Sequence, residues 1–358
     1  EQPNPEPESA LDHLFSNSSD LDASCTIDPK GVKDKIVMVD SINHALSEEL
    51  EFNDKMLIYG EDVGGDKGGV FTATRGLTKK FSDERVFNSP LAESSIIGTA
   101  IGLSVVGYKP VVEIQFGDYI WPAMMQIRNE VATMRYRSAG NWTCPLVIRV
   151  PVGGYIHGSL YHSQSIDGYF AHTPGLKIAY PSNAADAKGL LKYACRCDDP
   201  VLFMEHKGIY RQGFASSLEP DEDYLLPFGK ARIVQEGDDL TIVTWGAIVQ
   251  KAVEASRNSN KSVEVIDIRT LNPLDMDTIL NSIKKTNRVI VAHEDHLTAG
   301  FGSEISAQIS DVGFEFLDAP VKRIASKDVH VAYSPNLENE ILVQTSWIEK
   351  EIEEIINY

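Results

Sequence analysis

Residues 85–116 read RVFNSPLAESSIIGTAIGLSVVGYKPVVEIQF, and this stretch decides the fold. It predicts a strand around Val86, a helix from Glu93 to Val106 and a second strand over residues 110–116. The second strand is apolar over most of its length, which is typical of a parallel sheet that helices cover on both faces. The stretch therefore predicts a strand–helix–strand unit of an α/β domain.

The same alternation continues on both sides of this unit. Before it, apolar residues from Ile36 to Leu50 recur at helical spacing and are followed by the short apolar run MLIYG at 56–60. After it, helix, strand, strand, helix and strand are predicted in turn over residues 121–137, 146–150, 176–180, 184–194 and 201–206. We therefore expect a first α/β domain over residues 34–212.

A second, smaller α/β domain is expected over residues 229–358. Its predicted strands cover residues 240–245, 263–268, 288–294 and 321–325, and its predicted helices cover residues 247–255, 276–283, 303–309 and 336–356. Residues 213–228 contain an acidic stretch with two prolines and are predicted to link the domains. Residues 1–33 are polar, acidic and without lasting periodicity, and are predicted to be a disordered tail or linker.

The composition excludes several classes of partner. The chain has 52 Asp and Glu residues against 33 Lys and Arg residues, a formal net charge of −19, which disfavours nucleic acid and anionic lipid. No run approaches the roughly 20 apolar residues that span a bilayer, and no signal-peptide pattern is seen, so we expect a soluble intracellular protein. Cys195 and Cys197 have no second ligand pair nearby, which argues against a zinc site or a disulfide framework.

Three predicted strand ends carry distinctive residues, and open α/β sheets bind ligands at the carboxyl ends of their strands. Glu61 precedes the glycine-rich GGDKGGVF at 64–71, which either contacts phosphate or is only a flexible turn. Glu93 begins a helix, where the helix dipole alone would also stabilise a carboxylate. The third end presents Gln115, Phe116, Asp118 and Tyr119. The tyrosine is either an aromatic shelf for a flat ring or part of the core.

Three histidines, His157, His162 and His172, lie in one polar and aromatic segment. Histidine suits proton transfer near neutral pH. A metal cluster is the alternative, but no helix with two histidines four residues apart frames it.

Taken together, these segments resemble the β subunit of thiamine-diphosphate-dependent branched-chain 2-oxo acid dehydrogenases, the decarboxylating component of a lipoyl multienzyme complex. The resemblance runs from Ile36 to Tyr358 through YGEDV, GGVF, RVFNSPLAE, EIQFGDYIWPA, LYHSQS, FAHTPGLK, EVIDIRTLNPLD and INY. It implies an α/β fold of two doubly wound domains, a transketolase-type pyrimidine-binding domain and then a transketolase C-terminal domain.

The resemblance also implies roles for individual residues. Glu93 matches the carboxyl group that hydrogen-bonds the aminopyrimidine of the cofactor, and His162 matches the histidine that guides protons during acyl transfer to a lipoyl group. Further cofactor-binding positions match Glu61, Leu91, Ala92, Gln115 and Tyr119, the last by stacking on the aminopyrimidine. Substrate positions match Phe116, Tyr119 and His162, whereas His157 and His172 have at most supporting roles.

A monovalent cation, usually potassium, is held in relatives by two loops, mainly through backbone carbonyls. The matching residues here are Cys144, Leu146, Val147, Ala194, Cys197 and Asp199. Cys197 stands where relatives often carry an acidic residue, so both a potassium site and its absence remain open.

The resemblance implies partners as well. The G-D-G motif that usually binds diphosphate and Mg²⁺ in such enzymes does not occur in this chain. We therefore expect an α-type subunit, or an α half fused upstream, to hold the diphosphate and Mg²⁺. The expected assembly contains two α and two β parts, with the β halves pairing and a lipoyl acyltransferase core as a further partner. The expected location is the cytoplasm in a bacterium and the mitochondrial matrix in a eukaryote.

Other functions remain as alternatives. The choice of a branched-chain substrate over pyruvate rests on LYHSQS at 160–165, and a pyruvate dehydrogenase β subunit is the nearest alternative. A single-chain transketolase or deoxyxylulose-phosphate synthase is disfavoured by the length and by the missing G-D-G. A non-catalytic structural subunit would be favoured if Glu93 or His162 were replaced, and both are present.

Overall fold

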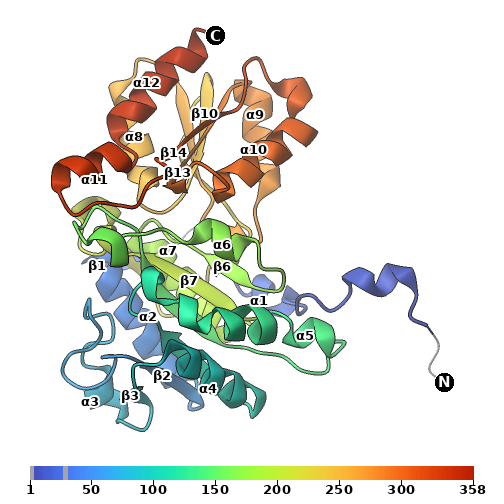
Figure 1. Ribbon diagram of the computed structural model, residues 1–358, viewed down its shortest axis with the longest axis vertical. Coiled ribbons are helices and arrows are strands. Elements are labelled where there is room, and N and C mark those ends of the chain that lie inside the picture. Colours follow the sequence, from blue (N-terminus) through green and yellow to red (C-terminus); the bar gives the residue numbers. More distant parts are fainter. Residues whose placement is uncertain (1–3, 27–30) are drawn as a thin grey trace.

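The computed structural model describes residues 4–26 and 31–358 as two α/β domains, one stacked on the other (Figure 1). Each domain has its own sheet, of seven strands in the first and five in the second, with helices on both faces. The predicted fold class is therefore confirmed. Across the described residues, no helix combines the length and the apolar character needed to traverse a lipid bilayer.

The sheet of the first domain has the strand order β12-β6-β7-β5-β4-β2-β3. Six of its strands are parallel: β2 (Met56–Gly60), β3 (Val86–Asn88), β4 (Lys109–Glu113), β5 (Val147–Val152), β6 (Lys177–Ala179) and β7 (Val201–His206). Every residue of β4, β5 and β7 is buried, which explains their continuous apolar runs. The seventh strand, β12 (Thr270–Asn272), comes from the second half of the chain and runs antiparallel to β6.

Helices cover both faces of this sheet. On one face, α2 (Met38–Phe52) and α7 (Ala184–Arg196) share a core cluster with Val111 and Val147. On the other face, α4 (Glu93–Val105) and α6 (Asp167–Ala171) share a cluster with Val112 and Ile148. Successive strand residues thus point to opposite faces, and both faces are buried.

The segment predicted as one helix over residues 121–137 is irregular. It consists of a 3₁₀ turn at Trp121–Ala123, a π-helical turn at Gln126–Val131 and the short α5 (Met134–Arg137). Pro122 cannot donate a backbone hydrogen bond, so a regular helix cannot pass through it from the preceding loop. The short α3 (Leu77–Phe81) completes the helices of the domain.

The sheet of the second domain has the strand order β14-β13-β10-β11-β9. Its strands are β9 (Arg232–Gln235), β10 (Leu240–Thr244), β11 (Val263–Asp267), β13 (Val289–His296) and β14 (Lys322–Ser326), of which β9 alone is antiparallel. Its helices are α8 (Ile248–Asn258), α9 (Met276–Thr286), α10 (Phe301–Val312), α11 (Pro335–Ile341) and α12 (Thr345–Ile356). The predicted last helix over 336–356 is therefore two helices. They are separated at Leu342 and Val343, which are buried, and the Val343 carbonyl accepts a hydrogen bond from Tyr155 of the first domain.

The predicted linker at 213–228 contains a strand. This strand, β8 (Ser217–Pro220), pairs with β1 (Gly31–Ile36) in a separate two-stranded antiparallel sheet. Leu225 and Leu226 of the same segment are buried. The segment is thus packed onto the first domain, which differs from a simple connection.

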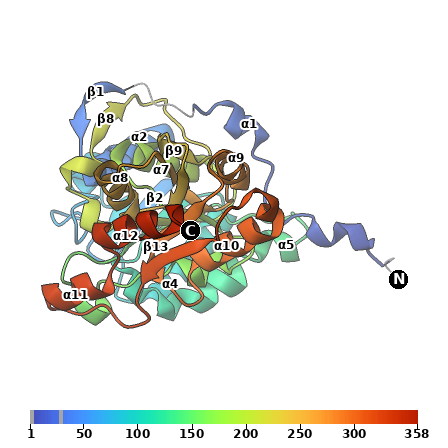
Figure 2. The same cartoon turned by 90° about the horizontal axis from the view of Figure 1, so that it is seen from above.

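Residues 4–26 contact the body, which differs from the expected disordered tail. Tyr193 donates a hydrogen bond to Asp22 of α1 (Ser19–Ala23), and Ser16 donates two to Asp199. Ahead of α1, the 3₁₀ turn at Pro7–Leu11 extends away from the two domains in both views (Figures 1 and 2). Residues 1–3 and 27–30, also part of the expected tail, lie outside the described residues.

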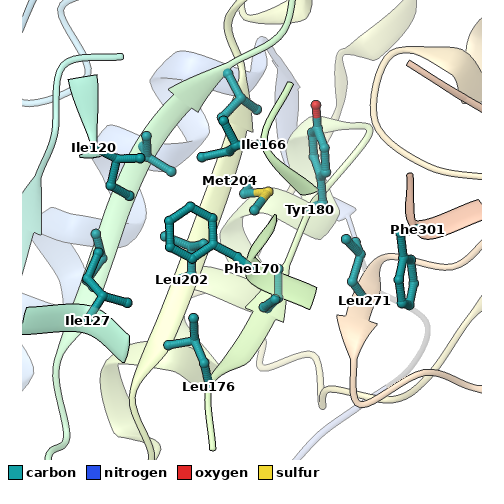
Figure 3. Close-up of a cluster of buried hydrophobic side chains, with 14 of the residues drawn as sticks. Ile120, Ile127, Ile166, Phe170, Leu176, Tyr180, Leu202, Met204, Leu271 and Phe301 are labelled. Atoms are coloured by element: carbon teal, nitrogen blue, oxygen red, sulfur yellow. The ribbon is translucent and has the colours of Figure 1, made fainter. Parts of the chain in front are cut away.

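The core of the first domain continues into the second. Figure 3 shows Phe170 and Tyr180 of the first domain in one cluster with Leu271 and Phe301 of the second, the last two side by side. Buried hydrogen bonds add to this contact: Trp245 Nε1 donates to Asp167 at 2.7 Å. The two domains therefore pack as one body at this boundary.

Arg149 on β5 is fully buried at the centre of the first sheet. Its guanidinium group donates to Glu113 of β4 at 2.7 Å and to both oxygens of Glu205 of β7 at 2.7 and 2.8 Å. One planar side chain thus connects three neighbouring strands near their carboxyl ends.

We expect Arg149→Met to lower the free energy of unfolding by about 3–5 kcal/mol, because it leaves two buried carboxylates without their cation. The matched control is Arg137→Met, since Arg137 forms an ion pair with Glu130 in which both side chains are 45–49% exposed. That control should change stability by less than about 1 kcal/mol. Denaturant unfolding of the purified chain measures both, and equal losses would contradict the role given to Arg149.

Candidate active site

The carboxyl ends of four neighbouring strands meet at one edge of the first sheet. Because β3, β2, β4 and β5 are adjacent and parallel, the segments that follow them lie beside one another. These segments carry the predicted site residues: Glu61 after β2, Glu93 after β3, Gln115 to Tyr119 after β4, and His162 after β5. The structure therefore brings together residues up to 101 positions apart in the chain.

Two carboxyl groups face this edge. Glu61 is 9% exposed and its Oε1 atom has no hydrogen-bond partner, while Glu93 is half-buried as the first residue of α4. Burial raises the pKa of Glu61, and the nearby charges of Glu93 and Asp62 raise it further. Burial and nearby negative charge therefore both favour the protonated form of the Glu61 carboxyl group.

The glycine-rich stretch at 64–71 packs tightly on its own domain. A Cβ atom on Gly68 would lie 2.2 Å from the Cα atom of Arg75, and one on Gly69 would lie 3.3 Å from Glu113 Oε1. Both glycines have a positive φ, 67° and 84°. Close packing and backbone conformation thus account for these glycines without a bound phosphate.

Tyr119 and His162 form a hydrogen-bonded pair. The Tyr119 hydroxyl lies 2.7 Å from His162 Nε2, and His162 Nδ1 lies 3.2 Å from the carbonyl oxygen of Gly158. A carbonyl oxygen can only accept, so Nδ1 carries the proton and, in the neutral ring, Nε2 accepts from Tyr119. The pair thus holds the imidazole in a single orientation with Nε2 toward the tyrosine.

Phe116 packs beneath this pair. Its ring meets His162 edge-on at 4.6 Å between centroids and Tyr119 at 5.3 Å. Lys207, directly after β7, lies over the same ring with Nζ 5.7 Å from the centroid and donates to the Gly153 carbonyl at 2.5 Å. Burial lowers the pKa of Lys207 to about 8, although Asp118 opposes this shift.

Asp118 is the acidic counterpart of Lys207. Burial raises the pKa of Asp118, while Lys207 and the backbone amides of Asp118 and Gln164 lower it. The Asp118 oxygens nonetheless receive no hydrogen bond of ordinary geometry. Sequence reasoning noted Asp118 without a role and missed Lys207, whose signal was its position directly after another parallel strand, β7.

The remaining predicted cofactor positions differ in exposure. Gln115 donates a hydrogen bond to Asp62 at 3.2 Å, which ties the loops after β4 and β2 together. Ala92 is half-buried directly before α4. Leu91 is 80% exposed, so within this chain its side chain does not line an enclosed pocket.

His157 and His172 lie apart from His162 in their contacts. The Nδ1 atom of His157 is 2.6 Å from Glu338 of the second domain, so this histidine helps to join the domains. His172 is exposed at the end of α6 and lines a cavity with His296 and His330. In residues 4–26 and 31–358, no group of three or more His, Cys, Asp or Glu side chains is arranged to hold a metal ion.

Two residues of the predicted potassium loops, Cys197 and Asp199, contact lysine amino groups. Lys109 Nζ donates to the Cys197 carbonyl at 2.6 Å, and Lys177 Nζ lies 2.9 Å from Asp199. The Leu146 carbonyl accepts the backbone amide of Val201. Burial lowers the pKa of Lys109, whereas nearby Cys197 and acidic groups oppose the shift. These partners do not fit the expectation of a cation at this position.

Comparisons with known proteins agree with this architecture. The model of the transketolase pyrimidine binding domain matches residues 34–212, and that of the transketolase C-terminal domain matches residues 229–348. A solved structure of a split-gene transketolase, an inactive β4 tetramer, has a TM-score of 0.72 at 22% identity and covers 90% of this chain and 98% of its own. This likeness supports the fold.

Closer relatives are β subunits of dehydrogenases. The β subunit of 2-oxoisovalerate dehydrogenase from Bacillus subtilis is 45% identical over 324 residues, 89% of this chain and 98% of the relative. The mitochondrial counterpart from Dictyostelium discoideum is 46% identical over 310 residues, 85% of this chain and 83% of the relative. The pyruvate dehydrogenase E1 component subunit beta of Bacillus subtilis is 44% identical over 303 residues, 84% of this chain and 92% of the relative.

Replacing Tyr119 with Phe removes the hydroxyl group that faces His162 but keeps the aromatic ring. We expect Nδ1 of His162 to keep its proton, because Gly158 still accepts it, and the Nε2 resonance to move toward that of a nitrogen without a hydrogen bond. Nitrogen-15 NMR of histidine-labelled protein measures both atoms, with Tyr169→Phe, an exposed tyrosine, as the control. An unchanged Nε2 resonance in Tyr119→Phe would show that the hydrogen bond is not formed.

Proposed function

The chain belongs to the β subunits of thiamine-diphosphate-dependent 2-oxo acid dehydrogenases, and we propose that its substrates are branched-chain 2-oxo acids such as 3-methyl-2-oxobutanoate. Together with an α-type subunit it decarboxylates the acid and transfers the acyl group to a lipoyl group. One observation carries the role of this chain: the buried Oε1 of Glu61, without a partner, lies in an acidic group with Glu93 at the carboxyl edge of the sheet.

The residues at this edge fit the aminopyrimidine half of thiamine diphosphate. Bound there, the cofactor supplies the electron sink for loss of carbon dioxide. Glu93 would hydrogen-bond a ring nitrogen of the cofactor and hold a proton there, and Glu61 lies near enough for the two carboxyl groups to interact. Tyr119 lies close to both carboxyl groups. Burial raises the pKa of Tyr119 most, and the charges of Asp118, Glu61 and Glu93 raise it further.

His162 is the acid–base group of the proposal. Its Nε2 atom accepts from Tyr119 and its Nδ1 atom is held by a backbone carbonyl, so the ring can move a proton only through Nε2. The buried Phe116 below keeps water away from that face of the imidazole. Proton transfer to and from the acyl group during its passage to the lipoyl group is the step assigned to Nε2.

An α-type partner completes the site. It supplies the residues for Mg²⁺ and the diphosphate, because this chain lacks G-D-G. Large exposed apolar side chains support such a contact: Leu91, two residues before α4, is 80% exposed, Val106, directly after α4, is 69% exposed, and Met125 is 66% exposed. Pairing of two β subunits and binding to a lipoyl acyltransferase core follow from the same proposal.

Pyruvate is the second candidate substrate. The pyruvate dehydrogenase relative is 44% identical, which is close to the 45% of a 2-oxoisovalerate dehydrogenase relative, so overall identity separates the two poorly. The branched-chain assignment therefore rests on LYHSQS at 160–165, which includes His162.

The two substrates are compared after co-purification of the chain with its α-type partner. We expect kcat/KM for decarboxylation of 3-methyl-2-oxobutanoate to exceed that for pyruvate by at least about tenfold, the discrimination that extra methyl groups in an apolar pocket provide. A preference for pyruvate would instead make the chain a pyruvate dehydrogenase β subunit.

We expect Glu93→Gln to reduce turnover of the assembled enzyme by about 10²- to 10⁴-fold, because an amide cannot hold the required proton. The thermal midpoint and the assembly with the partner should remain unchanged, since Glu93 is only half-buried. Glu84→Gln, an exposed glutamate in the turn before β3, is the control. Turnover within tenfold of the wild type would remove Glu93 from the mechanism.

A further inference from the structure

We infer that the amino groups of Lys109 and Lys177 take the place of a monovalent cation at the two loops around Cys197, so that the assembled protein binds no potassium there. The inference rests on the family membership but not on the substrate. Six residues of these loops match cation-binding positions of relatives: Cys144, Leu146, Val147, Ala194, Cys197 and Asp199.

The Lys109 side chain contacts the Cys197 carbonyl oxygen, one of the predicted potassium ligands. Lys109 begins β4, is 7% exposed, and its Nζ atom lies 2.6 Å from the Cys197 carbonyl oxygen. The resemblance implies that potassium would be held mainly by carbonyl oxygens, and Cys197 is a buried residue whose carbonyl oxygen already has an amino group against it. Lys109 thus already uses one lone pair of this oxygen and brings a positive charge to the place that an ion would take.

Lys177 occupies the other side of the same loop. Its Nζ atom lies 2.9 Å from Asp199 Oδ2 and 3.6 Å from the Cys197 sulfur atom, and Lys177 is 6% exposed. Asp199 is the carboxylate of the predicted set and is 1% exposed. Its charge is therefore already neutralised by a buried ion pair.

Two residues of the N-terminal segment, Phe15 and Ser16, also contact this loop and Lys177. The Ser16 backbone amide donates to Asp199 Oδ1 and its hydroxyl to Oδ2, both at 2.8 Å. The ring of Phe15 lies against Lys177, with Nζ 5.7 Å from the ring centroid. The Asp199 carboxylate thus accepts two hydrogen bonds and one ion pair from this chain itself.

Charge also opposes an additional cation. Lys109 and Lys177 already bring two amino groups to one buried carboxylate and one carbonyl oxygen. A potassium ion would add a further positive charge beside them, where burial strengthens repulsion between like charges. Two members of the predicted set, the Cys197 carbonyl and the Asp199 carboxylate, are thus already bound by amino groups of this chain.

The test measures ion binding and stability, without substrate. The assembled protein is freed of potassium and melted in KCl, NaCl and choline chloride at equal ionic strength, and its potassium content after desalting is measured by atomic spectroscopy. We expect the midpoints to agree within about 1 °C, since an ion that does not bind the folded state cannot stabilise it. A KCl-specific rise of several degrees, or about one potassium ion retained per β chain, would overturn the inference.

The variant Lys109→Ser tests the substitution itself. It frees the Cys197 carbonyl, so we expect a lower midpoint in choline chloride and a recovery of several degrees that is specific to KCl. Lys79→Ser, at an exposed lysine of α3, should show neither effect. Equal loss of stability in all three salts would mean that Lys109 does not replace an ion. These readouts are independent of turnover, so a failure of the proposed substrate would leave them intact.

Discussion

The buried Arg149 fixes the strand ends on which the site depends. Its contacts to Glu113 and Glu205 hold β4, β5 and β7 in one arrangement, and the segments that carry Tyr119, His162 and Lys207 begin within a few residues of these contacts. Glu205 also accepts from the Tyr210 hydroxyl. A bidentate guanidinium pair has little freedom in angle. The buried ion pairs at the centre of the sheet therefore help to fix where the segment that carries His162 begins.

The site has buried side chains on one side of the imidazole and acidic side chains at the carboxyl edge of the sheet. Phe116 and Lys207 lie buried below the imidazole, whereas Glu61 and Glu93 face the carboxyl edge together. Carboxyl groups close to one another and out of water keep protons that they would lose in solution. At this edge, burial and the neighbouring charges of Glu93 and Asp62 raise the pKa of Glu61 and so favour its protonated form.

Part of this arrangement follows from local sequence, and part does not. The alternation of strands and helices and the start of α4 at Glu93 were predictable, because they depend on periodicity within short windows. The Tyr119–His162 pair joins residues 43 positions apart, and β12 adds to the sheet of the other domain, so both depend on tertiary packing. The contacts of residues 4–26 with the first domain were not predicted for the same reason, because they involve side chains far away in the sequence.

The polar atoms at the site indicate how it is completed. A buried carboxyl oxygen without a hydrogen bond costs free energy, about 1–3 kcal/mol for an ordinary polar group and more for a charged one. Glu61 Oε1 is such an atom, while the more deeply buried carboxylate of Asp199 in the same domain is bonded by Lys177 and Ser16. Other buried carboxyl oxygens of the described residues also lack a partner, among them both oxygens of Asp118. What distinguishes Glu61 is its position at the edge where Leu91 is 80% exposed, so that a bound group and a partner subunit can supply the missing contact there.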